Sequence, residues 1–197
     1  MTPAPRGRPW DWAPGPIPHT LSDHACIDFV NSRFSDHTGG GRDFDRLELD
    51  EWRRWFLERC GLSSHPPPHL RMHGELVGLR SLLRRLLESR RPPSDEDVAQ
   101  LNYWLSRSAQ RWELVRDRAG VQLERRWSDS GWPAAMALMA ASYVELLVSG
   151  RIRRVRVCAN PSCSFIFCDG SRNASRRWCD VAVCGNLVKV RRHRATA

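Results

Sequence analysis

Cys158-Ala-Asn-Pro-Ser-Cys163 is followed by Cys179-Asp-Val-Ala-Val-Cys184, so the last fifth of the chain holds two C-x4-C pairs. The segment around them is rich in Gly, Ser and Arg and has few large apolar side chains from which to build a core. A metal ion bound by four thiolates supplies the missing folding free energy, and tetrahedral zinc is the usual metal for such a set. The spacing therefore predicts one structural zinc ion on Cys158, Cys163, Cys179 and Cys184. Four buried free thiols are the alternative.

The excess positive charge lies in the same segment. Residues 151–197 hold 11 Lys and Arg against two acids, whereas residues 1–150 hold 20 bases and 20 acids. A compact cationic segment attracts polyanions, which favours nucleic acid as the partner, with DNA ahead of RNA. The candidate contacts are Arg172, Arg176, Arg177, Lys189, Arg191, Arg192 and Arg194. A solvated face, or ion pairs with the rest of the chain, would also account for these bases.

Length and composition suit one medium domain with a small appendage. Met1 to Pro18 is rich in Pro and Gly and lacks a secretory apolar region, so residues 1–20 are expected to form a flexible tail. We expect a cytoplasmic protein with reduced thiols, in which metal binding outranks disulfides. Trp132 to Val148 is apolar but interrupted and too short for a membrane span, so no membrane partner is expected.

Apolar spacing predicts a helical domain over residues 21–150. The predicted helices have their buried faces at Leu49, Trp52, Phe56, Leu57 and Cys60, at Leu76, Leu79, Leu83, Leu86 and Leu87, and at Val98, Leu101 and Leu105. Ser94 and Asp97 form an imperfect capping box before the third helix. Trp112–Val115 and Val121–Trp127 predict a β-hairpin, and residues 133–149 a buried helix ended by Gly150.

Residues 151–197 are predicted to form the metal-binding module, with the domain boundary near Gly150. Arg alternates with Ile or Val from Arg151 to Val157, which favours a short strand, and residues 165–167 suit the partner strand of a hairpin. A basic helix is expected after Cys184. The fold class is therefore mainly α with small β pieces (α+β), ending in a treble-clef or zinc-ribbon-like finger.

Two parts of the chain resemble known families. Arg176-Arg177-Trp178-Cys179 with Cys184-Gly185-Asn186, preceded by Asp169, Ser171 and the first cysteine pair, resembles the CGNR zinc-finger family of bacterial proteins. Cys26-Ile27-Asp28-Phe29-Val30-Asn31-Ser32, followed by a helix with Trp52 and Trp55 and by Gly61-Leu62, is similar to the ABATE domain. Together the two resemblances cover most of residues 21–192. They imply a stress-induced transcription regulator whose finger binds nucleic acid.

Two residues depart from the family pattern. Leu187 stands where the family has the Arg that ends its name, which removes one candidate phosphate contact. Arg191, Arg192 and Arg194 follow further along and are expected to compensate. Cys168 is an additional thiol, which we interpret as a non-ligand residue of the hairpin rather than a replacement for Cys163.

An enzyme is not expected, because the chain has no Gly-rich phosphate loop, no nucleophile elbow and no HExxH motif. Asp28 and Asn31 are polar residues in an apolar stretch and are candidates for lining a small-molecule pocket, although hydrogen-bonded structural roles explain them equally well. The large domain would then act as a sensor or scaffold, with a homodimer through that domain as a further expectation. An RNA-binding ribbon and a protein-interaction module are the alternative functions.

Overall fold

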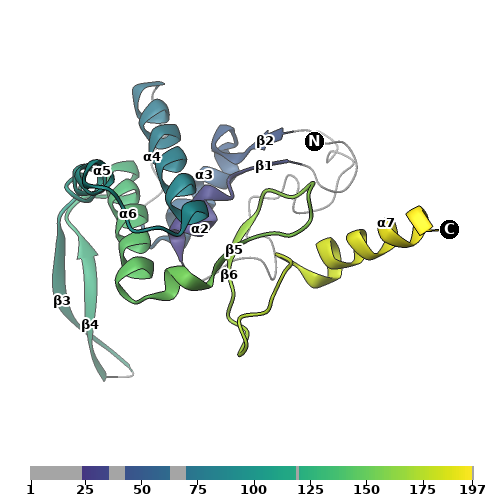
Figure 1. Ribbon diagram of the computed structural model, residues 1–197. Coiled ribbons are helices and arrows are strands. Elements are labelled where there is room, and N and C mark those ends of the chain that lie inside the picture. Colours follow the sequence, from purple (N-terminus) through teal and green to yellow (C-terminus); the bar gives the residue numbers. More distant parts are fainter. Residues whose placement is uncertain (1–23, 36–42, 63–69, 119, 197) are drawn as a thin grey trace, which may run out of the picture.

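The computed structural model describes residues 24–35, 43–62, 70–118 and 120–196 (Figure 1). The N-terminal elements are α2 (Ala25–Val30), β1 (Arg33–Ser35), β2 (Asp43–Asp45), a 3-10 turn (Arg46–Glu48), α3 (Asp50–Arg59), α4 (Leu70–Ser89), α5 (Asp95–Leu105), β3 (Gln110–Asp117), β4 (Gly120–Trp127) and α6 (Trp132–Val148). The C-terminal elements are η2 (Arg151–Arg154), β5 (Val155–Val157), β6 (Ile166–Cys168), η3 (Val181–Gly185) and α7 (Asn186–Thr196). The predicted α+β class is confirmed.

Helix α6 is the centre of the helical body, in contact with α2, α4 and α5. It is apolar and buried on most of its circumference, and its alanines have small side chains that let neighbouring helices approach closely. Pro133 stands in its first turn, where no backbone donor is needed. Gly150 follows its end with φ +71°, a left-handed conformation that glycine adopts without steric cost.

The predicted helices are present, but two predicted core residues are wrong. Leu49 is the residue before α3 rather than part of its buried stripe, and it is 37% exposed. Val98 is 44% exposed because the inward stripe of α5 runs through Asp97, Leu101 and Trp104, at steps of four and three residues. The capping box at the start of α5 is complete.

In the described ranges, three two-stranded antiparallel sheets accompany the helices. The predicted hairpin forms as β3 and β4, and it extends away from the helical body (Figure 1). The predicted strand over Arg151–Val157 is only partly right, because residues 151–154 form a 3-10 turn that places Ile152 in the helical core. Only Val155–Val157 form a strand, which pairs with β6.

The finger packs directly on the helical body. Val155, Ile166 and Cys168 belong to the same apolar cluster as α2, α4 and α6. Arg84 of α4 also donates a hydrogen bond to the carbonyl of Ser164, at 2.8 Å. The division of the chain near Gly150 stays a prediction. The expected tail, residues 1–20, lies outside the described residues.

Candidate metal centre and basic finger

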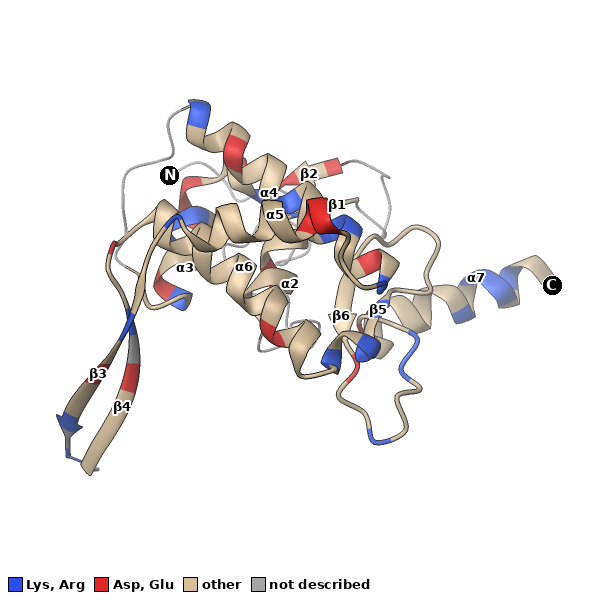
Figure 2. Cartoon of the chain, turned by 60° about the vertical axis from the view of Figure 1, so that its left-hand side comes forward, with Lys and Arg blue, Asp and Glu red and all other residues tan. Residues whose placement is uncertain are grey.

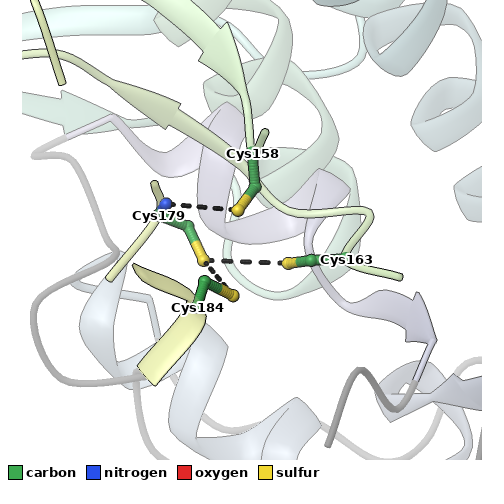
Figure 3. A group of neighbouring side chains, drawn as sticks. All are labelled: Cys158, Cys163, Cys179 and Cys184. Carbon is green, nitrogen blue, oxygen red and sulfur yellow. Dashed lines mark hydrogen bonds between the residues drawn. The ribbon is translucent and has the colours of Figure 1, made fainter. Parts of the chain in front are cut away.

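The first cysteine pair lies in the connection between β5 and β6. The backbone N–H of Cys158 donates to the carbonyl of Phe165 at 2.9 Å, and that of Cys163 donates to the carbonyl of Asn160 at 2.8 Å. The Asn160 side chain accepts the N–H of Ser162 at 3.2 Å, which closes a tight Asx-type turn. The turn brings the sulfurs of Cys158 and Cys163 to the same side of the chain (Figure 3).

The second pair brackets the turn that leads into α7. Asp180 caps this turn by accepting two backbone N–H groups, at 2.7 and 3.2 Å, and so fixes the path from Cys179 to Cys184. A Cβ atom on Gly185 would lie 3.2 Å from Cδ1 of Trp178. Glycine therefore lets the indole pack closely against the turn that carries Cys184.

The four sulfurs form one compact, buried cluster whose ligand atoms all lie within 4.8 Å of one another. The Sγ of Cys179 lies 3.7 Å from that of Cys163 and 3.5 Å from that of Cys184 (Figure 3). Tetrahedral zinc with Zn–S bonds of about 2.3 Å requires sulfurs roughly 3.8 Å apart. The geometry of the side chains therefore fits a four-thiolate zinc site.

The four thiols also influence one another's pKa values. Hydrogen bonding from Cys163 and Cys179 lowers the pKa of Cys158 to about 7. The hydrogen bond with Cys158 raises the pKa of Cys163 above its usual range. Hydrogen bonding with Cys158, Cys163 and Cys184 raises the pKa of Cys179. Without a metal the cluster can thus stabilise one thiolate, whereas a divalent ion allows all four to ionise.

Two N–H groups point at the sulfurs and orient them. The backbone N–H of Cys179 donates to Sγ of Cys158 at 3.4 Å, and Nδ2 of Asn160 donates to Sγ of Cys184 at 3.5 Å. Such donors hold ligand sulfurs in position and partly offset thiolate charge. The spacing of the cysteines gave no signal for Asn160, which lies inside the first pair.

Aromatic residues from both parts of the chain surround the cluster. Phe165 and Phe167 are fully buried beside the cysteines, and Trp178 is partly buried against them. Phe34, on β1 of the helical body, stacks on Phe165 with ring centroids 5.3 Å apart. The small core of the finger is therefore completed by a residue more than 120 positions away in the sequence.

Arg176 faces into the finger. Its guanidinium donates to the carbonyls of Trp178 (2.9 Å) and Cys179, and it lies over the ring of Phe167 at 4.7 Å. Its backbone N–H donates to the buried carboxylate of Asp169 at 2.9 Å. These contacts hold the loop that carries Cys179 in place.

Five of the other predicted contact residues are exposed on two segments of the finger. Arg172 and Arg177 are exposed on the loop between β6 and Cys179, whereas Lys189, Arg192 and Arg194 are exposed on α7. Figure 2 shows these elements carrying Lys and Arg at one end of the molecule. We call these five exposed residues, Arg172, Arg177, Lys189, Arg192 and Arg194, the basic surface.

Arg191 joins α7 to the first cysteine pair. Its guanidinium donates to Oγ of Ser162 at 3.0 Å and lies 3.5 Å from Oδ1 of Asn160. Leu187, at the position of the family Arg, is half-buried in the first turn of α7. Arg191 therefore fixes the direction in which α7 leaves the finger.

Cys168 does not belong to the sulfur cluster. It is buried at the end of β6, in the apolar core shared with the helical body. This placement agrees with its interpretation as a non-ligand thiol.

Asp28 and Asn31 have different surroundings. Asp28 accepts a hydrogen bond from Nε of Arg59 at 2.8 Å and lines a cavity of about 230 Å³ between α2, α3 and α6. Asn31 lies at the other end of α2 and pairs with the backbone of Ile166. The structure does not bring the two side chains together in one pocket, and a small-molecule ligand stays a prediction.

Comparison with known families agrees with these two parts. The ABATE family model, described as "putative stress-induced transcription regulator", matches residues 23–150, and the CGNR zinc finger model matches residues 154–197. Neither description is that of an enzyme class. No curated protein matches the chain. With the geometry of the sulfurs, the match assigns one structural zinc ion to Cys158, Cys163, Cys179 and Cys184.

Within the described residues, none of the helices has the length and apolar character that a membrane span requires.

Proposed function

We propose that this chain, which belongs to the ABATE family and ends in a CGNR zinc finger, regulates transcription by binding double-stranded DNA through its basic surface. The observation that carries the proposal is α7, an 11-residue helix with no buried residue and no acidic residue. Lys189, Arg192 and Arg194 are exposed on it, and Arg172 and Arg177 are exposed on the loop of the finger that precedes Cys179. Such a surface gains free energy by releasing counterions from phosphates.

The form of α7 supports duplex DNA as the target. A helix of 11 residues is about 16 Å long, and the major groove of B-DNA is wide enough to admit one. Figure 1 shows α7 leaving the body, so a duplex can approach it without meeting the helical core. Arg176 and Arg191 act as positioning residues in this proposal, because their guanidinium groups hold the finger and α7 in place.

The aromatic residues of the finger favour duplex DNA over single-stranded RNA. Proteins that bind single strands stack bases on exposed aromatic rings. Phe165, Phe167 and Trp178 are the only aromatic residues in 151–197, and none of them is exposed. Phosphate contacts by arginine are therefore the better supported mode.

The zinc ion has a structural role in this proposal. It offsets two of the four thiolate charges and gives the finger the rigidity that the basic residues need. Four protein ligands leave no open position for a substrate. The helical body serves as the scaffold on which the finger is held. We include a cytoplasmic location in the proposal, because a bacterial transcription regulator meets its DNA there.

The test measures binding of the zinc-loaded chain to a random 30-base-pair duplex by fluorescence anisotropy, in competition with single-stranded RNA. Affinity for the duplex should fall with salt with a logarithmic slope near −4.5, about 0.9 for each of roughly five phosphate contacts. Replacing Arg192→Ala together with Arg194→Ala should reduce the slope by about 2. A matched control is Arg54→Gln with Arg91→Gln, which removes the same charge from exposed positions of the helical body.

Three outcomes would contradict the proposal. The first is an affinity for duplex DNA that does not change with salt. The second is an equal loss of affinity in the control variant, which would mean that net charge alone drives binding. The third is a preference for single-stranded RNA, or the absence of any nucleic-acid complex at low salt, which would favour the RNA-binding or protein-interaction alternative respectively.

A further inference from the structure

The hairpin of β3 and β4 has two chemically different faces. Leu114 pairs with Leu123 in the antiparallel register, and Trp112 and Val121 lie two residues away on the same face. The opposite face carries Arg111, Glu113, Glu124 and Arg126, which form ion pairs with one another at 2.7 to 3.9 Å. Alternation of this kind is typical of a strand pair with one face in water and the other covered.

The apolar face is open over the described part of the chain. Trp112 is 67% exposed, Leu114 72%, Leu123 62% and Val121 50%. Together these four side chains expose roughly 450 Å² of largely apolar surface, within the range at which contiguous patches mark interaction sites. An isolated two-stranded hairpin is also marginally stable in water, so a cover on this face would stabilise it.

We infer that the apolar face of β3–β4 is the contact surface for a second copy of this chain. Two such faces would remove roughly 900 Å² from water, which is the size of a weak, reversible interface rather than a permanent one. A two-fold contact needs a surface that is complementary to itself. The centre of this face is the apolar pair Leu114 and Leu123, and the register places Arg116 opposite Val121 and Arg125 opposite Trp112 on either side of it.

A two-fold axis that lies between the faces, perpendicular to the strands at the Leu114–Leu123 pair, stacks β3 on β3 in antiparallel orientation. Leu114 then meets Leu114 of the second copy, and Leu123 meets Leu123. Trp112, on the body side of the pair, meets Arg116 near the tip of the second hairpin, since both lie on β3 two residues from Leu114. A guanidinium over an indole ring is a favourable contact. The antiparallel arrangement also keeps the two helical bodies at opposite ends.

The position of the hairpin leaves the finger accessible in such a dimer. In both views the hairpin and α7 lie at opposite ends of the molecule (Figures 1 and 2). Pairing through β3–β4 therefore doubles the number of basic surfaces without covering either one. The inference does not depend on DNA binding, because association is measured without nucleic acid.

Sedimentation equilibrium of the zinc-loaded full chain, from about 1 µM to 1 mM, tests the inference. The wild type should show a monomer–dimer equilibrium. Leu114→Glu places two carboxylates on the two-fold axis and should raise the dissociation constant roughly 100-fold or more. Gln122→Glu adds the same charge to the opposite face and should leave the dissociation constant unchanged. An equimolar mixture of Leu114→Glu and Leu114→Lys chains should dimerise again, because the two charges then meet with opposite sign.

Recovery in the mixture supports the inference even if each variant alone is less stable, because chains that fail to fold cannot complement each other. A wild type that stays monomeric over the whole range overturns the inference. If the β3 and β4 amides of that monomer are nevertheless protected from hydrogen exchange, the cover belongs to the same chain. A dimer unaffected by Leu114→Glu would also overturn it, by assigning the contact to another surface.

Discussion

The side chain of Asn31 forms two hydrogen bonds with the backbone of Ile166, across 135 positions of sequence. Nδ2 of Asn31 donates to the carbonyl of Ile166 at 2.7 Å, and Oδ1 accepts its N–H at 2.9 Å. The amide thus pairs with β6 as a neighbouring strand would. Both groups are buried, so this pairing fixes the finger on α2 of the helical body.

Replacing Asn31→Ala should lower the free energy of unfolding by about 2–4 kcal/mol, because it leaves one buried N–H and one buried carbonyl without partners. Urea unfolding followed by circular dichroism measures the change. Asn102→Ala is the matched control, since Asn102 is exposed on α5 and its loss should cost less than about 0.5 kcal/mol. Equal stability of the two variants would show that β6 is not held by Asn31.

Arg176 and Arg177 are adjacent bases with opposite expected roles. Arg176→Ala removes the hydrogen bonds to Trp178 and Cys179, so it should speed zinc loss to a chelator and lower stability by about 2 kcal/mol. Arg177→Ala removes only an exposed guanidinium, 5.3 Å from the centre of the Trp178 ring, so it should change both quantities much less and mainly weaken DNA binding. Zinc release is followed with a colorimetric indicator. Faster release from the Arg177→Ala chain than from the Arg176→Ala chain would reverse the assignment.

The first turn of α5 should depend on Ser94, whose Oγ accepts the N–H of Asp97 at 3.2 Å. Ser94→Ala should cost about 1 kcal/mol, the usual value of an N-cap. Ser106→Ala, at the other end of the same helix, should change stability by less than about 0.5 kcal/mol. Thermal unfolding of the three chains makes the comparison, and a Ser94→Ala chain as stable as the wild type would refute the cap.

Asp97 should make stability depend on pH in the acid range. The hydrogen bond from Arg85 at 2.6 Å, followed by that from the Ser94 backbone, lowers the pKa of Asp97 to about 2. The carboxylate therefore stabilises the fold above its unfolded pKa of about 3.9, and this contribution disappears as pH falls towards 2.

Comparing urea midpoints of the wild type and Asp97→Asn at a series of pH values tests this. The difference between them should be constant from about pH 7 to 5 and shrink below about pH 4. A difference that grows as pH falls would mean that the pKa of Asp97 is raised rather than lowered.

Local patterns in the sequence predicted most of the helices and the zinc ligands. Leucines at steps of three and four residues define α4, and the paired cysteines define the sulfur cluster. What the sequence could not provide depends on tertiary contact. The pairing of Asn31 with Ile166 and the stacking of Phe34 on Phe165 join segments that are distant along the chain.

The sequence also could not show which of the charged residues face inwards. Arg176 and Arg177 are indistinguishable by composition, yet only Arg176 is turned inwards by the carbonyls around Cys179. Val98 fits a helical repeat with Leu101, but the register of α5 on α6 buries Asp97 and Trp104 beside Leu101 and leaves Val98 exposed. Periodicity predicts that a stripe exists, and packing decides which residues form it.

The central claim is that four thiolates bind one zinc ion and so organise the basic finger. X-ray absorption at the zinc edge, with metal analysis of the purified chain, tests it most directly. We predict one zinc per chain with four sulfur ligands at about 2.3 Å, retained in Cys168→Ser and lost in Cys163→Ser. Substoichiometric zinc after metal-replete expression, or nitrogen or oxygen ligands in the first shell of the wild type, would contradict the account.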